Sequence, residues 1–187
     1  STFRFKILIC LGIALVGGVL FAVADTPLIS PFLKGDGNPA DAAAILDYGR
    51  AYLKMMLPGL LPFAITNAYA GTLKETGETV VPMLGGVAAT LVNLVLNYIL
   101  IFGHFGAPEM GVEGAALATV ISRFAELAIV AGWTHRHTEK NPFIVGAYRS
   151  MAVPAGLLRS ITVKGMPLLA NELLWSTGMT FLNQCYS

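Results

Sequence analysis

The pattern of apolar positions along the chain divides it into five long hydrophobic runs, at residues 7–24, 53–73, 80–103, 112–133 and 166–187. A helix that crosses the hydrocarbon core of a bilayer needs about 20 mostly apolar residues, and each run is roughly that long. The runs lack a period-two alternation, so they predict helices rather than strands. Since lipid offers an open backbone no hydrogen-bond partners, we expect an all-α, polytopic membrane helix bundle with about five transmembrane helices.

Composition supports that class of protein. Hydrophobic residues make up 55% of the chain and charged residues 12%, whereas a soluble domain carries roughly 25% charged residues. The net charge of +1 provides no basic field for a nucleic acid, so no nucleic-acid partner is expected. Cys10 and Cys185 both lie in apolar runs, which favours small core residues over a disulfide or a metal site.

Basic residues gather on one side of the membrane if the chain weaves through it. They precede the first run, follow the second and separate the fourth from the fifth: Arg4, Lys6, Lys74, Arg136, Lys140, Arg149, Arg159 and Lys164. On the opposite side, the loop 104–111 has no Lys or Arg, and the loop that holds Lys34 and Arg50 also holds four aspartates. Because cytoplasmic loops are enriched in basic residues, the chain is predicted to start in the cytoplasm and its last run to head outward.

The stretch 135–165 is long for a connection between bundled helices. Its second part, IVGAYRSMAVPAGLLRSITVKG, mixes basic with apolar residues, as an amphipathic helix at the membrane interface does. Pro154 interrupts that pattern. A plain cytoplasmic linker between two bundles is therefore an equal alternative.

Small residues recur every four positions at the start of the fourth run. One helix face carries Gly111, Ala115 and Thr119, and the neighbouring face carries Gly114, Ala118 and Ser122. Small side chains at this spacing let helix backbones approach closely in lipid, so the pattern predicts helix packing.

Amides and prolines inside the runs are candidates for a cavity lining. Asn93 and Asn97 are one turn apart on one face, where they either hydrogen-bond to another helix or line a substrate cavity. Pro58 and Pro62 each remove a backbone hydrogen bond, which predicts either a static kink or a hinge beside a cavity. Asn67 lies one to two turns beyond them and is a further cavity candidate.

Three charged residues lie well inside the runs, away from their ends. Arg123 and Glu126 are three positions apart, so they are predicted to pair on one helix face; a role in ion coupling or gating is the alternative. Glu172 has no opposite charge within one turn. An isolated carboxyl inside the membrane indicates a functional site, with Asn171 beside it as a second oxygen donor; pairing with a base elsewhere is the alternative.

Several motifs resemble one transporter family. The stretch YLKMMLPGLLPFAITNAYAGTLKETGETVVPML resembles the fourth helix and following loop of the multidrug and toxic compound extrusion (MATE) family. The stretch LVNLVLNYILIFGHFGAPEMGVEGAALATVISR resembles its fifth and sixth helices, with an asparagine pair, an Ile-Phe-Gly end and a Gly-Val-x-Gly-Ala-Ala opening. GMPLLANELLWSTGMTFLNQ is similar to the start of the seventh helix in bacterial members.

The resemblance implies a twelve-helix fold of two six-helix bundles. Residues 1–134 would then form the rest of the N-terminal bundle, its third to sixth helices. Residues 135–165 would be the cytoplasmic loop between the bundles, and 166–187 the truncated seventh helix that starts the C-terminal bundle. The chain would be a fragment whose partners are the lipid bilayer and the remaining half of the transporter, in the inner (plasma) membrane.

The resemblance also implies an activity. The family exports cationic, amphiphilic drugs and metabolites by antiport with sodium ions or protons, and no other cofactor is expected. Several members use acids on the seventh helix for the coupling cation, and Glu172 is the matching candidate. In some members this acid stands one turn further along, where this chain has Trp175.

Other functions are weighed against this one. A lipid-linked oligosaccharide flippase of the same broad superfamily is the alternative, but flippases carry several bases in their central cavity, and Arg123 is the only deep base here. The motifs His-Glu-x-x-His and Gly-x-Ser-x-Gly are both absent from the sequence, which argues against an intramembrane enzyme. The intramembrane acid and the paired prolines argue against a scaffold without transport activity.

Overall fold

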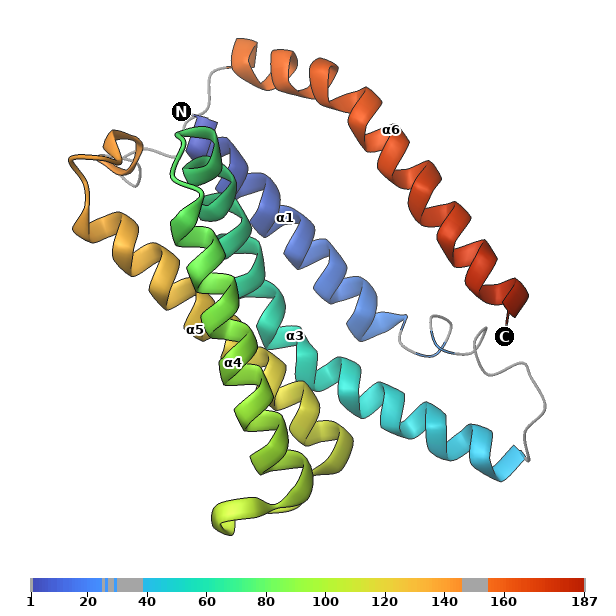
Figure 1. The fold of residues 1–187 in the computed structure, drawn as a ribbon. Coiled ribbons are helices and arrows are strands. Elements are labelled where there is room, and N and C mark those ends of the chain that lie inside the picture. The colour runs from blue at the N-terminus through green and yellow to red at the C-terminus, as the bar shows by residue number, and fades with distance from the viewer. Residues whose placement is uncertain (1, 25, 27–28, 30–38, 146–154, 187) are drawn as a thin grey trace.

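The computed structural model describes residues 2–24, 26, 29, 39–145 and 155–186. This part of the chain contains no strand. Five long helices correspond to the five apolar runs: α1 (Thr2–Val23), α3 (Pro39–Glu75), α4 (Val80–Phe102), α5 (Gly111–Arg136) and α6 (Ala155–Tyr186). Two short 3₁₀ turns, η2 (His104–Gly106) and η3 (Pro142–Ile144), follow α4 and α5 (Figure 1). The all-α membrane fold is thereby confirmed.

Three of these helices, α1, α4 and α5, are long and apolar enough to cross a membrane. Helices α3 and α6 are longer still, but prolines, asparagines and charged side chains dilute their apolar residues. α3 begins at Pro39 rather than near Leu53, and α6 at Ala155 rather than near Met166. Part of the stretch 135–165 is therefore helical, while Pro154 lies outside the described residues. The division into domains at 134 and 165 stays a prediction.

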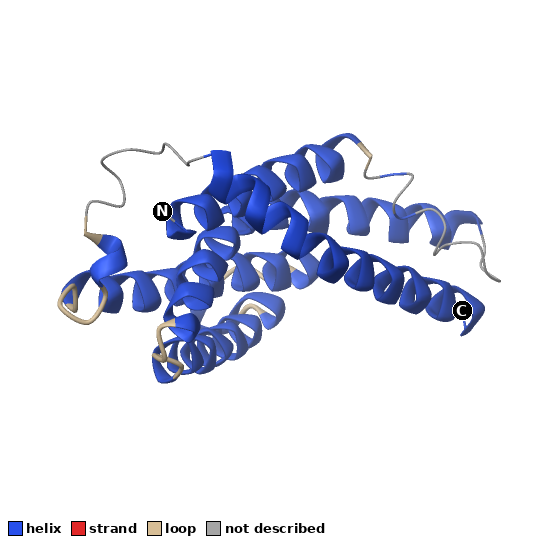
Figure 2. Ribbon diagram, turned by 90° about the horizontal axis from the view of Figure 1, so that it is seen from above, coloured by secondary structure: helices blue, strands red, loops and turns tan. Residues whose placement is uncertain are grey.

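Helix α5 is the centre of the packing. It packs against both α3 and α4, and α1 packs against α3. α6 lies apart from these four helices, and its described side chains are almost all exposed (Figure 1, red; Figure 2). The described part of the chain is thus a four-helix bundle with a fifth helix beside it.

Glycines set the closest approach of α4 and α5. A Cβ atom on Gly114 would lie 2.7 Å from the carbonyl oxygen of Leu100, and one on Gly85 would lie 2.8 Å from a methyl group of Val130. The face that carries Gly114, Ala118 and Ser122 is buried, which confirms the packing predicted from the four-residue spacing. At the end of this helix pair, Gly103 adopts a left-handed conformation with φ of 67°, and the Met110 N–H donates to the Leu100 carbonyl over 2.9 Å.

Helix α3 continues through both of its prolines and changes direction in its middle, where they lie (Figure 1). Pro62 is fully buried. A proline ring removes one hydrogen bond of the helix and crowds the carbonyl four residues earlier, which bends the helix axis. The kink predicted from the sequence is therefore present, and the hinge role of the two prolines stays a prediction.

The end of the bundle where α1 starts is held by aromatic and polar contacts. The Phe3 ring meets the Tyr69 ring edge-on, with centroids 5.0 Å apart, and also contacts Phe143. The Tyr69 hydroxyl lies 3.0 Å from Nε2 of His135, which links α3 to α5. An ion pair between Lys6 and Glu75 links α1 to α3. By the distribution of basic residues, this end is the predicted cytoplasmic one.

Candidate functional site

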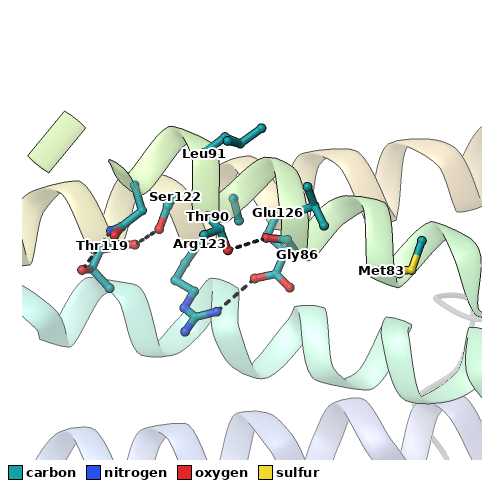
Figure 3. A pocket seen from close by; sticks show the side chains of 11 residues that line it. Met83, Gly86, Thr90, Leu91, Thr119, Ser122, Arg123 and Glu126 are labelled. Carbon is teal, nitrogen blue, oxygen red and sulfur yellow. Dashed lines mark hydrogen bonds and ion pairs between the residues drawn. The ribbon is translucent and has the colours of Figure 1, made fainter. Parts of the chain in front are cut away.

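Polar side chains from α4 and α5 surround a hollow between the first part of α4 and the middle of α5 (Figure 3). The hollow has a volume of about 630 Å³, which falls within the size range of ligand pockets. Every lining residue belongs to α4 or α5. They are Met83, Gly86, Val87, Ala89, Thr90, Leu91, Asn93, Thr119, Ser122, Arg123 and Glu126. We call this space the α4–α5 hollow.

Asn93 links the two helices beside the hollow. Its Nδ2 donates to the Thr119 hydroxyl over 3.2 Å, and its Oδ1 accepts a 2.9 Å hydrogen bond from Nδ2 of Asn97. The Oδ1 atom of Asn97 is buried and has no hydrogen-bond partner in the described part of the chain. The predicted interhelical bond is therefore present at Asn93, and the same residue lines the hollow, so the two interpretations of the pair are compatible.

Arg123 and Glu126 form the predicted ion pair near the middle of α5. Nη1 of Arg123 donates to Oε2 of Glu126 over 3.1 Å. The Glu126 side chain is 16% exposed and the Arg123 side chain 40%. The Arg123 guanidinium also lies over the ring of Phe63 on α3, with 4.9 Å from Cζ to the ring centroid. Figure 3 shows the arginine side chain extending from α5 toward α3.

A second, smaller hollow lies on the other side of Arg123, between α3 and α5. It has a volume of about 220 Å³. Its lining is Met56, Gly59, Leu60, Phe63, Thr119, Val120 and Arg123. We call it the α3–α5 hollow. Pro58 and Pro62 lie within the stretch of α3 that lines it, so the helix bend and the arginine meet at this place.

The remaining candidates lie elsewhere. Nδ2 of Asn67 donates to the Phe63 carbonyl of its own helix over 2.9 Å, and the residue is exposed. Asn171 and Glu172 are exposed on α6, and neither lines either hollow. The structure therefore joins Asn93, Arg123 and Glu126 in one place and leaves Asn67, Asn171 and Glu172 outside it.

Sequence reasoning missed Phe63 and Thr90. Phe63 contacts Arg123 from a different helix, so no spacing along the chain reveals that contact. Thr90 stands one turn before Asn93 on α4, and that proximity alone was the available signal. Among the residues that the structure describes, no group of three or more His, Cys, Asp or Glu side chains is placed to hold a metal ion.

The fold and the hollow define a polytopic helix bundle with a space of ligand size, lined by charged and polar side chains, between two helices that are long and apolar enough to cross a membrane. A family model described as MatE matches residues 1–99, and the chain belongs to that family. The resemblance to MATE proteins is thereby confirmed.

Three relatives illustrate the similarity. The chain is 37% identical over 124 residues to a probable multidrug resistance protein NorM of Thermotoga maritima, covering 63% of this chain and 25% of the relative. It is 32% identical over 126 residues to a protein of the same name in Bacillus licheniformis, covering 67% and 27%. It is 26% identical over 159 residues to the probable multidrug resistance protein YoeA of Bacillus subtilis, covering 85% and 34%.

The chain thus spans about a quarter to a third of the length of these relatives. No solved structure matches it.

Proposed function

We propose that the chain is part of a multidrug efflux transporter that exports cationic, amphiphilic compounds by antiport with sodium ions or protons. The observation that supports this most directly is the α4–α5 hollow, which presents a carboxylate, hydroxyls and an amide between two helices of membrane-spanning length in a bundle of the MatE family. Polar groups within a membrane are costly and commonly mark the path of a substrate or an ion.

The proposed transporter consists of two helix bundles, and this chain supplies most of the first and the start of the second. It resides in the inner (plasma) membrane with the start of α1 in the cytoplasm. The two bundles rock about a central cleft and expose it to each side in turn. The bend of α3 is proposed to flex during this exchange. Transport is coupled only because substrate and ion differ in their affinities for the two states.

Glu172 is proposed to belong to the site of the coupling ion. Its place on α6, outside the four-helix bundle, suits a residue that faces a second bundle across a cleft. A sodium ion would bind its carboxylate oxygens, and a proton would neutralise them. Asn171 and Asn67 are proposed to contact the substrate or ion from the same cleft.

The charges in the α4–α5 hollow argue against the flippase alternative. A lipid pyrophosphate needs unpaired bases, whereas the one base that lines this hollow, Arg123, is paired with Glu126. A space whose charges sum to zero offers a dianionic group no net attraction.

The test uses the full-length protein that contains this chain, reconstituted in lipid vesicles. Ethidium movement is followed under an imposed sodium gradient and then under a proton gradient, for wild type and for Glu172→Gln. The matched control is Glu78→Gln, which removes a partly exposed acid in the turn between α3 and α4.

We expect gradient-driven ethidium movement in wild type and in the control, and its loss in Glu172→Gln. Movement that survives in Glu172→Gln would keep the exporter and remove Glu172 from the coupling site. A folded wild-type protein that moves no ethidium under either gradient would refute the proposed antiport.

A further inference from the structure

The Arg123–Glu126 pair is open to exchange because a single hydrogen bond joins the two side chains. Glu126 has one polar partner in the described part of the chain, the single 3.1 Å bond from Nη1 of Arg123. A guanidinium and a carboxylate that pair face to face form two such bonds and are stronger. Glu126 also lines the α4–α5 hollow, so a cation in that space can approach the carboxylate.

A second environment is available to the Arg123 side chain if its bond to Glu126 breaks. An unpaired charge inside a membrane protein is costly, so an exchangeable arginine needs a second environment. The centroid of the Phe63 ring lies 4.9 Å from Cζ of Arg123, and the face of this ring attracts the guanidinium independently of Glu126. The α3–α5 hollow, which Arg123 and Phe63 both line, gives the side chain about 220 Å³ of space on that side.

The size of the α4–α5 hollow sets the class of ligand. A volume of about 630 Å³ exceeds what a bare metal ion needs and matches an organic molecule. Its lining combines apolar side chains, among them Met83, Val87 and Leu91, with the Glu126 carboxylate. That combination suits an organic cation that has a large apolar body.

We propose that the α4–α5 hollow is a binding site for an organic cation, which takes the place of Arg123 at Glu126 while Arg123 keeps its contact with Phe63 and shifts into the α3–α5 hollow. Arg123 is then an internal competitor of the substrate. This inference rests on the proposed function, because it gives that transporter a substrate site within the first bundle. It also links occupation of the site to the bent part of α3, since Phe63 directly follows Pro62.

The experiment measures equilibrium binding of tetraphenylphosphonium to the full-length protein in lipid nanodiscs. Glu126→Gln is expected to weaken binding roughly tenfold or more, because a charge-assisted contact is lost. Arg123→Gln is expected to strengthen binding, because the internal competitor is removed. A merely structural ion pair predicts the opposite sign for Arg123→Gln, since breaking a structural contact does not improve a binding site.

Two further variants keep the test decisive. The double variant Arg123→Gln and Glu126→Gln leaves no unpaired charge, so it guards against misfolding, and it is expected to bind as weakly as Glu126→Gln. Glu75→Gln breaks the other ion pair described, at the end of the bundle, and is expected to leave binding unchanged.

The outcomes separate this inference from the proposed function. Wild-type binding that weakens in both single variants, or changes in neither, would overturn the inference and leave the exporter intact. A folded wild type that does not bind tetraphenylphosphonium would overturn both. Stronger binding in Arg123→Gln together with weaker binding in Glu126→Gln would establish the exchange.

Discussion

Replacing Gly114 by alanine tests whether the close contact of α4 and α5 sustains the fold. The added Cβ would lie 2.7 Å from the Leu100 carbonyl oxygen and 2.9 Å from its carbonyl carbon. Both atoms belong to the backbone of α4, so they cannot rotate away as the end of a side chain does. The two helices must separate locally, and the 3.2 Å bond from Asn93 to Thr119 lies between the same two helices.

The magnitude follows from two opposing contributions. Alanine favours a helix over glycine by about 1 kcal/mol in the free energy of unfolding. Overpacking a tight interior contact costs about 1–3 kcal/mol, and a rigid backbone neighbour places this site at the upper end. We therefore expect Gly114→Ala to lower the free energy of unfolding by about 1–2 kcal/mol.

Gly132 provides the matched control on the same helix. A Cβ there meets no atom within 4 Å, so Gly132→Ala should gain the helix preference and cost nothing in packing. The assay compares thermal unfolding of wild type and both variants of the full-length protein in one detergent. A Gly114→Ala protein as stable as the Gly132→Ala protein would refute the account of this contact.

Three further substitutions should change stability by amounts that the contacts determine. Asn93→Ala removes the bond to Thr119 and should cost about 1 kcal/mol, the scale of interhelical hydrogen bonds in membranes. Tyr69→Phe keeps the ring on Phe3 but loses the contact to His135, and should also cost about 1 kcal/mol. Lys6→Gln breaks an ion pair whose acid is largely exposed, and should cost no more than about 1 kcal/mol. All three effects are measured as shifts of the unfolding temperature in the same thermal unfolding assay.

These expectations have their own controls. Thr90→Val removes a hydroxyl that bonds only to its own helix, at the Gly86 carbonyl, and should cost less than Asn93→Ala. Tyr98→Phe removes a hydroxyl from a half-exposed ring stacked on His104, and should change stability less than Tyr69→Phe. Equal losses in either matched pair, or a large loss in Lys6→Gln, would contradict the roles assigned to these contacts.

The helix bounds show what hydrophobic patterning captures. α4 was predicted at 80–103 and occupies Val80–Phe102, because Pro82 near its start and Gly103 at its end coincide with the limits of the apolar run. α3 and α6 begin well before their apolar runs. The apolar run marks the part of a helix that can lie in lipid. The helix itself can extend beyond that run wherever the backbone conformation allows it.

At the site, contacts within one helix could be predicted from the sequence, whereas contacts between helices could not. The Arg123–Glu126 pair follows from a spacing of three residues on one helix. The stacking of Arg123 on Phe63 and the bond from Asn93 to Thr119 join different helices, and their register depends on how glycines such as Gly114 set the helices together. The sequence alone therefore shows which residues are present, but it does not show which of them contact each other across helices.

The α4–α5 hollow has a consequence for how this membrane protein is assembled. All of its lining lies within residues 83–126, in two consecutive helices that a short connection joins. Neighbouring helices of this kind associate early, because closing a short loop costs little entropy. The hollow can therefore form while later helices are still being synthesised and inserted. It is also inherited as one block of sequence, so recombination outside that block would leave its polar groups together.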